Sequence, residues 1–313
     1  MNDIRLLRFL LDQGGIGERE ANLLDPTEKA PLHYAAEFKY LELGKLLLTV
    51  PGINVNIANK QGKTPLHFIA EDNDNNQMNS IAFAKLLLSF GADINFRAKD
   101  GQTPLHEASN SFHWEMVEFL VLQGADVNTQ DDDGATALTC PVLDHNFGIS
   151  KMLIDSGAEV NFMFYHETHL TFYLRYQTSL LHEAVSDVDL LCLLINSGAA
   201  INSRDEYGRT PLHVSFDCEA SRILLKSGAI WSFVDNRGRS PLDFAINVHR
   251  SKRLVTYYLM LEVILMLCSI RHSPRFLNGT PFAIIPLELV QKIIFAVNFE
   301  NFAHKIDGFE SLL

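Results

Sequence analysis

Apolar residues recur at helical spacing in short stretches along the chain, and the same residues mark the ends of each stretch. In residues 115–122, which read EMVEFLVL, the apolar positions follow one helix face, and Gly124 comes next as the expected helix stop. Upstream, Thr103 and Pro104 have the signature of a helix start, because the hydroxyl caps free N–H groups and proline has no N–H to lose. The pattern predicts pairs of short helices.

This pattern repeats. A helix start of the form Thr-Pro-Leu-His, or a variant of it, begins at seven positions that are 30 to 43 residues apart: 30, 64, 103, 136, 179, 210 and 240. A second element, Gly-Ala, which in four copies continues through two residues to Asn, begins at 91, 124, 157, 198 and 228. One such unit cannot bury its apolar stripe alone, so we expect neighbouring units to stack.

Over residues 1–250 the sequence resembles the ankyrin-repeat family, which has this period and this Thr-Pro-Leu-His signature. The resemblance implies an all-α fold, an ankyrin-repeat solenoid of about seven repeats with no β-sheet beyond hairpins in the loops, or fingers, between repeats. The first unit is expected to be partial, with its second helix at 1–14. A structural role, in hydrogen bonds between loops, is implied for His67, His106, His182 and His213.

The net charge limits the classes of binding partner, and the cysteine content indicates the redox conditions of the cell compartment. Lys and Arg total 26 against 38 Asp and Glu, a net charge of -12, so the surface does not attract nucleic acid or an anionic membrane over long range. The four cysteines are far apart without a C-x-x-C pair, which favours a reducing compartment. The N-terminus has no secretory h-region. We expect a cytoplasmic or nuclear protein, in the host cytoplasm if the source is a virus or an intracellular bacterium.

Three departures from the repeat pattern stand out. Repeat two has extra polar residues at 71–77, which we interpret as a solvated loop or, less simply, a functional one. In repeat four, Pro141 falls inside the first helix and the histidine of the pattern is lost, so we expect that helix to be kinked or shortened. The largest departure is a finger insertion at 162–178, between repeats four and five.

Six of the fifteen residues at 162–176 are aromatic, and three interpretations are open. His166 and His169 are too close for the H-E-x-x-H metal motif and no third ligand follows, so a metal site is the weakest of the three. The insertion could fold back on neighbouring fingers as an apolar cluster. It could instead be a binding hot spot, because exposed Tyr, Phe and Arg side chains dominate interface energetics.

The family resemblance implies that a target protein binds on the concave face, at the finger tips and inner helices. With the tyrosines of the insertion added as anchors, the predicted target-binding residues are Lys60, Lys63, Lys99, Asp100, Gln102, Asp131, Asp132, Asp133, Tyr165, Tyr173, Arg175, Tyr176, Tyr207, Arg209 and Arg237. The centre of this stripe is acidic, which weakly indicates a basic patch on the target.

Residues 251–313 differ in composition and are expected to form a helical C-terminal module. Residues 254–270 form an apolar run, but it is shorter than a typical membrane span and has Glu262 near its middle, so we favour a buried helix over a membrane helix. After a polar turn, Pro286 opens a second amphipathic segment at 284–297.

This second segment resembles the start of an F-box, and its shortness resembles the truncated F-box-like (PRANC) ending found behind ankyrin repeats. The resemblance implies binding to a Skp-type cullin adaptor through Ile285, Pro286, Leu287, Leu289, Val290, Ile293 and Ile294. A SOCS box is a rival, but Glu288 stands where its second proline belongs. A plain capping helix is the structural alternative.

These resemblances together predict a non-catalytic substrate receptor of a cullin-RING ubiquitin ligase, without a cofactor or metal. The ankyrin stack would hold the target, and the C-terminal segment would hold the adaptor. No Gly-rich phosphate loop, no G-x-S-x-G motif and no Cys–His arrangement outside the repeat pattern occurs in the sequence. A scaffold or inhibitor that only binds, and a membrane-anchored adaptor, remain as alternatives.

Overall fold

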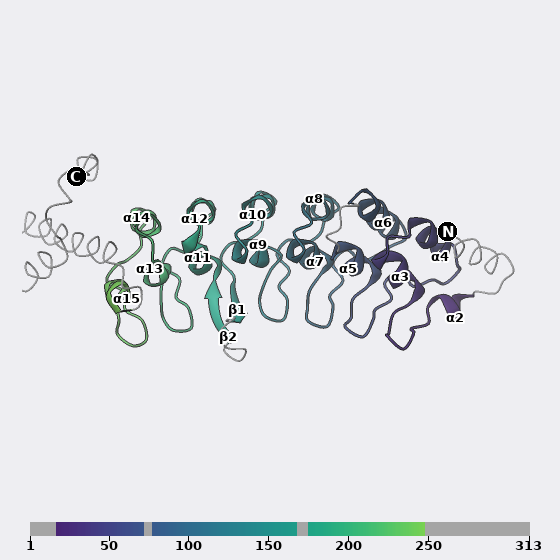
Figure 1. The fold of residues 1–313 in the computed structure, drawn as a ribbon, viewed down its shortest axis with the longest axis horizontal. Coiled ribbons are helices and arrows are strands. Elements are labelled where there is room, and N and C mark those ends of the chain that lie inside the picture. Colours follow the sequence, from purple (N-terminus) through teal and green to yellow (C-terminus); the bar gives the residue numbers. More distant parts are fainter. Residues whose placement is uncertain (1–16, 72–76, 168–174, 248–313) are drawn as a thin grey trace, which may run out of the picture. The chain divides into compact units, whose positions relative to one another are not determined.

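The structure is a computed structural model that describes residues 17–71, 77–167 and 175–247 (Figure 1). They form two compact units, which we describe separately. Unit 1 comprises the described residues up to Ala184 together with Cys192–Ala199, and unit 2 comprises Val185–Leu191 and the described residues from Ala200 onward. Several predicted segments lie outside the described residues: the helix at 1–14, most of the polar loop at 71–77, the middle of the insertion, the apolar run at 254–270 and the F-box-like segment at 284–297.

Unit 1 consists of helix pairs that stack in two rows, as Figure 1 shows. The inner row contains α3 (Pro31–Glu37), α5 (Pro65–Ala70), α7 (Pro104–Asn110), α9 (Thr139–Leu143) and α11 (Leu180–Glu183). The outer row contains α4 (Leu41–Leu48), α6 (Gln77–Ser89), α8 (Trp114–Leu122) and α10 (Phe147–Asp155). Consecutive helices of each row pack against one another, so the stacking predicted from the repeats is confirmed within this unit.

The remaining elements of the described chain are short. A four-residue helix, α2 (Glu18–Ala21), precedes the first pair. A 3-10 turn (Ala184–Ser186) and α12 (Val188–Asn196) contribute residues to both units. Unit 2 contains α13 (Pro211–Val214), α14 (Cys218–Lys226) and α15 (Pro241–Asn247), and α13 packs on both of the others.

At the Thr-Pro-Leu-His starts, the histidine side chain links its own repeat to the next one by hydrogen bonds. The backbone N–H of Thr103 donates to His106 Nδ1 at 3.1 Å, so the ring proton lies on Nε2, which donates to the carbonyl oxygen of Ala135 in the next repeat at 3.2 Å. Burial lowers the pKa of His106, which favours the neutral ring that this arrangement needs. His33, His67 and His213 make the same pair of bonds. The predicted structural role is therefore confirmed for His67, His106 and His213.

Repeat four keeps only the first of these two hydrogen bonds. Its first helix, α9, begins at Thr139, three residues into the motif, whereas α7 begins at its second residue, Pro104. The predicted shortening of this helix is therefore confirmed. Thr139 Oγ1 accepts from the backbone N–H of Thr136 at 3.0 Å, as the histidine does elsewhere, but the side chain has no counterpart of Nε2 to reach the next repeat.

The core of unit 1 draws on both rows and includes one close approach within the outer row. Leu66 and Leu105 of the inner row are buried, as is Phe83 of the outer row. The ring of Phe83 lies against Gly44 of α4, where an added Cβ would stand 2.4 Å from Phe83 Cζ. Glycine at this position lets α4 and α6 approach closely enough for the aromatic ring to fill the space between them.

The aromatic insertion forms the one sheet of the described residues. Strand β1 (Met163–Glu167) pairs antiparallel with β2 (Arg175–Ser179), in a register that places Met163 opposite Ser179. The backbone N–H of Tyr165 also donates to the carbonyl oxygen of Asp133, at 2.9 Å, which attaches the hairpin to the preceding finger. In Figure 1 the hairpin lies among the fingers of unit 1.

No helix within the described ranges is long and apolar enough to span a membrane. The apolar run at 254–270 is not among those residues.

Candidate protein-binding groove

A groove on the inner side of unit 1 brings together several predicted binding residues. It has a volume of about 370 Å³ and lies between α7, α9, the finger at 131–135 and strand β1. Its lining residues are Gln102, His106, Asn110, Asp131, Asp133, Ala135, Thr136, Thr139, Cys140, Leu143, Phe164, Tyr165 and His166. We call this surface the concave groove. Its size falls within the range of about 300–1,000 Å³ that is typical of ligand pockets.

One wall of the concave groove is acidic. Asp131 accepts hydrogen bonds from the backbone N–H groups of Asp133 and Ala135, both at 2.9 Å, which fixes the tight turn of this finger. Burial raises the pKa of the Asp131 carboxyl, and the neighbouring Asp100 and Asp132 act in the same direction. Neither lysine nor arginine is among the described residues that line the groove, so its field favours a cationic group.

Repeat four contributes small side chains to the concave groove, where threonine stands at the position of the histidine. Thr139 and Cys140 stand there, and the Cys140 thiol donates to Asp144 at 3.2 Å. Burial, together with Asp144, raises the pKa of Cys140 to about 12. The thiol is therefore protonated at neutral pH and is a poor nucleophile.

The hairpin wall combines a buried aromatic group with an exposed one. Phe164 is buried, whereas the neighbouring Tyr165 is 48% exposed. His166 stacks on Tyr176, with ring centroids 5.8 Å apart and an interplanar angle of 9°, and its Nδ1 lies 3.7 Å from Glu183 Oε2. Phe164 is therefore packed inside unit 1, whereas Tyr165, the next residue of β1, has about half of its surface exposed to solvent.

The structure separates the predicted binding residues into groups. Gln102, Asp131, Asp133 and Tyr165 come together at the concave groove, while Lys60, Lys99, Asp100 and Asp132 lie on the finger tips of unit 1. Tyr207, Arg209 and Arg237 belong to fingers of unit 2. Tyr176 packs on His166, Arg175 lies in β2, and Tyr173 is outside the described residues.

Lys63 is largely engaged inside unit 1. Its Nζ lies 2.8 Å from Glu107 Oε1 and 3.2 Å from Glu71 Oε2, and only 20% of its side chain is exposed. Burial acts to lower the pKa of the ammonium, but the two carboxylates outweigh it and the pKa is raised. Burial likewise raises the pKa of Glu107, against the pull of Lys63. This ion pair joins repeats two and three, so its first role is structural.

Sequence reasoning missed Asn110, Cys140, Leu143 and His166 as groove residues. Asn110 ends α7, and its side-chain N–H donates to Gln102 Oε1 at 3.2 Å, which links the inner helix to the preceding finger. The signal in the sequence was repeat four, which has lost its histidine and has Pro141 inside its first helix. A helix that starts late there leaves its first residues beside α7 and β1 as part of the groove lining.

The chemistry of the concave groove suits binding. Nowhere in the described part of the chain do three or more His, Cys, Asp or Glu side chains gather as a metal site. Of the two histidines considered as metal ligands, His169 lies outside the described residues. The groove offers carboxylates, side-chain amides and a phenol, which are groups that recognise a peptide through hydrogen bonds and charge.

Comparisons with known proteins agree with this architecture. A family profile described as "Ankyrin repeats (3 copies)" matches residues 1–78 and 74–163, more than half of the 313-residue chain. No curated protein matches the chain. The crystal structure of the ankyrin repeat domain of Bcl-3, described as a unique member of the IkappaB protein family, is similar at 24% identity with a TM-score of 0.58, over 74% of this chain and 98% of that one.

A second solved structure, the ankyrin repeat domain of human ASB11, is 26% identical with a TM-score of 0.54, over 70% of this chain and 93% of that one. Ankyrin repeats are modules for protein–protein interaction. With the profile match and the stacked helix pairs of unit 1, the chain belongs to the ankyrin-repeat family.

Proposed function

We propose that the chain holds a segment of a target protein in the concave groove and presents that target to a cullin-RING ubiquitin ligase as its substrate receptor. The observation that carries the binding half is the concave groove itself, in which an exposed Tyr165 stands beside the carboxylates of Asp131 and Asp133. A target segment with a Lys or Arg next to an apolar side chain matches this lining.

The adaptor half of the proposal rests on the sequence pattern at 284–297, which resembles the start of an F-box. Its residues lie outside the described residues, so the proposal uses their spacing alone. In this arrangement the chain supplies no catalytic group, because a substrate receptor only brings the target near the ubiquitin-carrying enzyme. The same function places the protein in the cytoplasm or the nucleus, where cullin ligases work.

The test is affinity purification of the full chain with mass spectrometry, using one variant for each half. Tyr165→Ala with Asp133→Asn changes the concave groove, and Pro286→Ala with Leu287→Ala changes the F-box-like segment. Tyr40→Ala is the matched control, because Tyr40 is a comparably exposed tyrosine of unit 1, at 52%, away from the groove.

We expect the groove variant to lose the target and keep the adaptor, and the second variant to do the reverse. If Tyr165 is a hot spot, truncation weakens target binding by about 30-fold, which corresponds to about 2 kcal/mol. A groove variant that keeps every partner of the control would place the binding face elsewhere. Targets captured without any Skp-type adaptor would favour the alternative, a non-catalytic scaffold with a structural C-terminal helix.

A further inference from the structure

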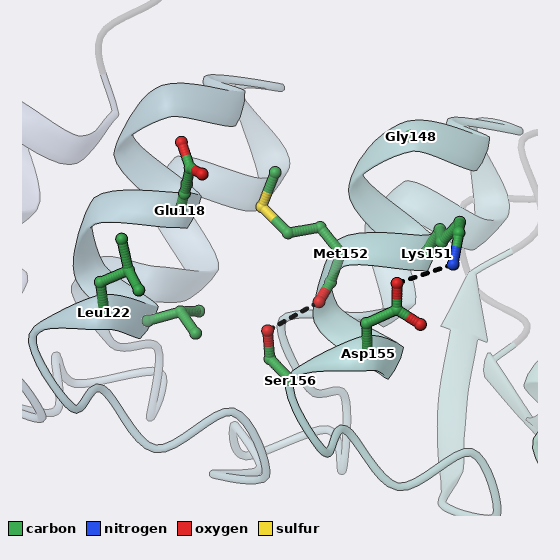
Figure 2. A pocket seen from close by; sticks show the side chains of 8 residues that line it. Glu118, Leu122, Gly148, Lys151, Met152, Asp155 and Ser156 are labelled. Carbon is green, nitrogen blue, oxygen red and sulfur yellow. Dashed lines mark hydrogen bonds and ion pairs between the residues drawn. The ribbon is translucent and has the colours of Figure 1, made fainter.

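A second groove lies on the outer row of unit 1, between α8 and α10. It has a volume of about 400 Å³, and Figure 2 shows it from close by. Its lining residues are Glu118, Val121, Leu122, Gly148, Lys151, Met152, Asp155 and Ser156. We call it the outer groove. None of these residues lines the concave groove, so a role for the outer groove does not depend on the proposed function.

The outer groove exposes apolar side chains that a solvated helix pair does not need. Leu122 is 75% exposed, the largest exposed fraction among the exposed large hydrophobic residues of the described chain. In Figure 2 the thioether of Met152 projects from α10 toward α8. Trp114 and Phe147, the first residues of the two helices, are also exposed, at 50% and 42%. The lining of the groove itself combines the apolar Val121, Leu122 and Met152 with charged residues, and exposed apolar groups with a polar rim are typical of an interaction surface.

Gly148 keeps the outer groove open although the backbone does not require a glycine there. It lies in the first turn of α10, and an added Cβ would meet only Asn146 Oδ1, at 3.6 Å, which is an ordinary contact. A larger side chain at this lining position would therefore reduce the open space of the groove without straining the backbone.

Of the two walls of the outer groove, only the α8 wall carries a charge without an ion-pair partner among the described residues. On the α10 wall, Lys151 Nζ pairs with Asp155 Oδ2 at 2.7 Å, as the dashed line in Figure 2 shows, so these two charges offset each other. On the α8 wall, Glu118 forms no ion pair with another described residue. Glu118 and Leu122 are four residues apart, and therefore lie on the same helix face one turn from each other.

We propose that the outer groove binds an amphipathic helix of a partner protein, which places an aliphatic or aromatic side chain against Leu122 and Met152 and a Lys or Arg beside Glu118. A helix suits this site because the groove runs between two helices, and residues three or four apart on a third helix meet both walls. The flexible Met152 side chain adapts to the inserted group. The cation compensates the unpaired carboxylate.

The test uses the full chain and two defined probes. One is a fluorescein-labelled 18-residue peptide with Leu at helical spacing and Lys elsewhere, and the other is the same peptide with every Lys replaced by Glu. Fluorescence anisotropy gives the dissociation constants. Methyl NMR of ¹³C-methionine protein, with the Met152 signal assigned by Met152→Leu, reports whether the peptide sits in the outer groove. Sedimentation of the chain without peptide reports self-association.

Three variants sharpen the result. Gly148→Leu fills the outer groove, Glu118→Gln removes its charge, and Glu42→Leu is the matched control, because it adds the same leucine to an exposed position of another outer helix, α4. Circular dichroism and the melting temperature verify that each variant is folded. A variant that does not fold is replaced by Gly148→Ala, which fills less space and raises helix propensity.

We expect the Lys peptide to bind with a dissociation constant below about 100 µM and to shift the Met152 methyl signal. Gly148→Leu should weaken binding about tenfold, Glu118→Gln should weaken it severalfold and reduce its salt dependence, and Glu42→Leu should leave it unchanged. Equal affinity for the Glu peptide, no binding up to about 1 mM, or binding that Gly148→Leu does not affect would overturn the proposal. Self-association abolished by Gly148→Leu would instead assign the groove to a second copy of the chain.

Discussion

Replacement of His67 by threonine, as repeat four has done naturally at Thr139, should remove one inter-repeat bond and one acid-sensitive group together. His67 is fully buried, its Nδ1 accepts from the Thr64 backbone N–H at 3.1 Å, and its Nε2 lies 3.2 Å from the carbonyl oxygen of Gln102. Threonine can keep the first bond but not the second. The loss of one hydrogen bond and of ring packing predicts about 1–3 kcal/mol of destabilisation at pH 7, because the Gln102 carbonyl oxygen keeps its bond from the Ala98 backbone N–H at 2.8 Å.

The pH dependence gives this prediction its sharper form. Burial, the main cause, lowers the pKa of His67 from 6.5 to about 4. The unfolded chain therefore binds a proton between pH 6.5 and pH 4 that the folded chain does not, so stability falls as the pH falls through this range and levels off below it. One such group accounts for a slope of up to about 1.4 kcal/mol per pH unit.

The assay is urea unfolding of the full chain, followed by circular dichroism, at pH 7.5, 6.0, 5.0 and 4.5. His67→Thr should be less stable than the wild-type chain at pH 7.5, and its disadvantage should shrink as the pH is lowered. His67→Ala, which also leaves the Thr64 N–H without its acceptor, should be less stable than His67→Thr at every pH. If the wild-type chain and His67→Thr lose stability in parallel from pH 7.5 to 4.5, the assignment of a buried neutral histidine is refuted.

Three further predictions concern the core and the buried ion pair. Leu105→Ala should lower the free energy of unfolding by about 2–5 kcal/mol because Leu105 is fully buried, and thermal denaturation of this variant measures the loss. Gly44→Ala should destabilise by about 1–3 kcal/mol because the new methyl group would overlap the Phe83 ring, and Gly44→Ala combined with Phe83→Leu should recover part of that loss in the same melting assay. Lys63→Met should lower the free energy of unfolding by about 3–5 kcal/mol at pH 7, because it leaves the Glu107 carboxylate buried without its counter-ion. The double variant with Glu107→Gln should lose less stability than this single variant, and a double-mutant cycle by urea unfolding measures the coupling energy of the pair.

Short sequence motifs predicted many of the helices of unit 1, but they predicted fewer of the residues that line its concave groove. The Thr-Pro starts, the glycine stops and the bridging histidines each work within one repeat and the edge of the next, so they can be recognised from a window of about 33 residues. The early sign of the concave groove was Pro141 and the missing histidine of repeat four. The groove itself depends on how α7, α9 and β1 face one another, and no single window contains that arrangement.

Lys63 shows why side-chain roles were harder to predict than elements. Its place beside Thr64 in a finger suggested a binding residue, but its partner Glu107 lies in another repeat and is buried. Leu122 shows the opposite case. A helical pattern that ends in leucine suggests burial, yet this leucine is mostly exposed and lines the outer groove.

The substitution at Thr139 has a consequence for cooperativity. In a linear array of repeats, total stability is a sum of the intrinsic stability of each repeat and a coupling between nearest neighbours, and unfolding divides the array where a coupling is weakest. The coupling after repeat four lacks the histidine bond that follows the other repeats with a complete motif in unit 1, and it retains the backbone bond from Tyr165 to Asp133. A partner that grips both Asp133 and the hairpin would span this weak coupling, so binding there would convert two loosely linked segments into one cooperative block.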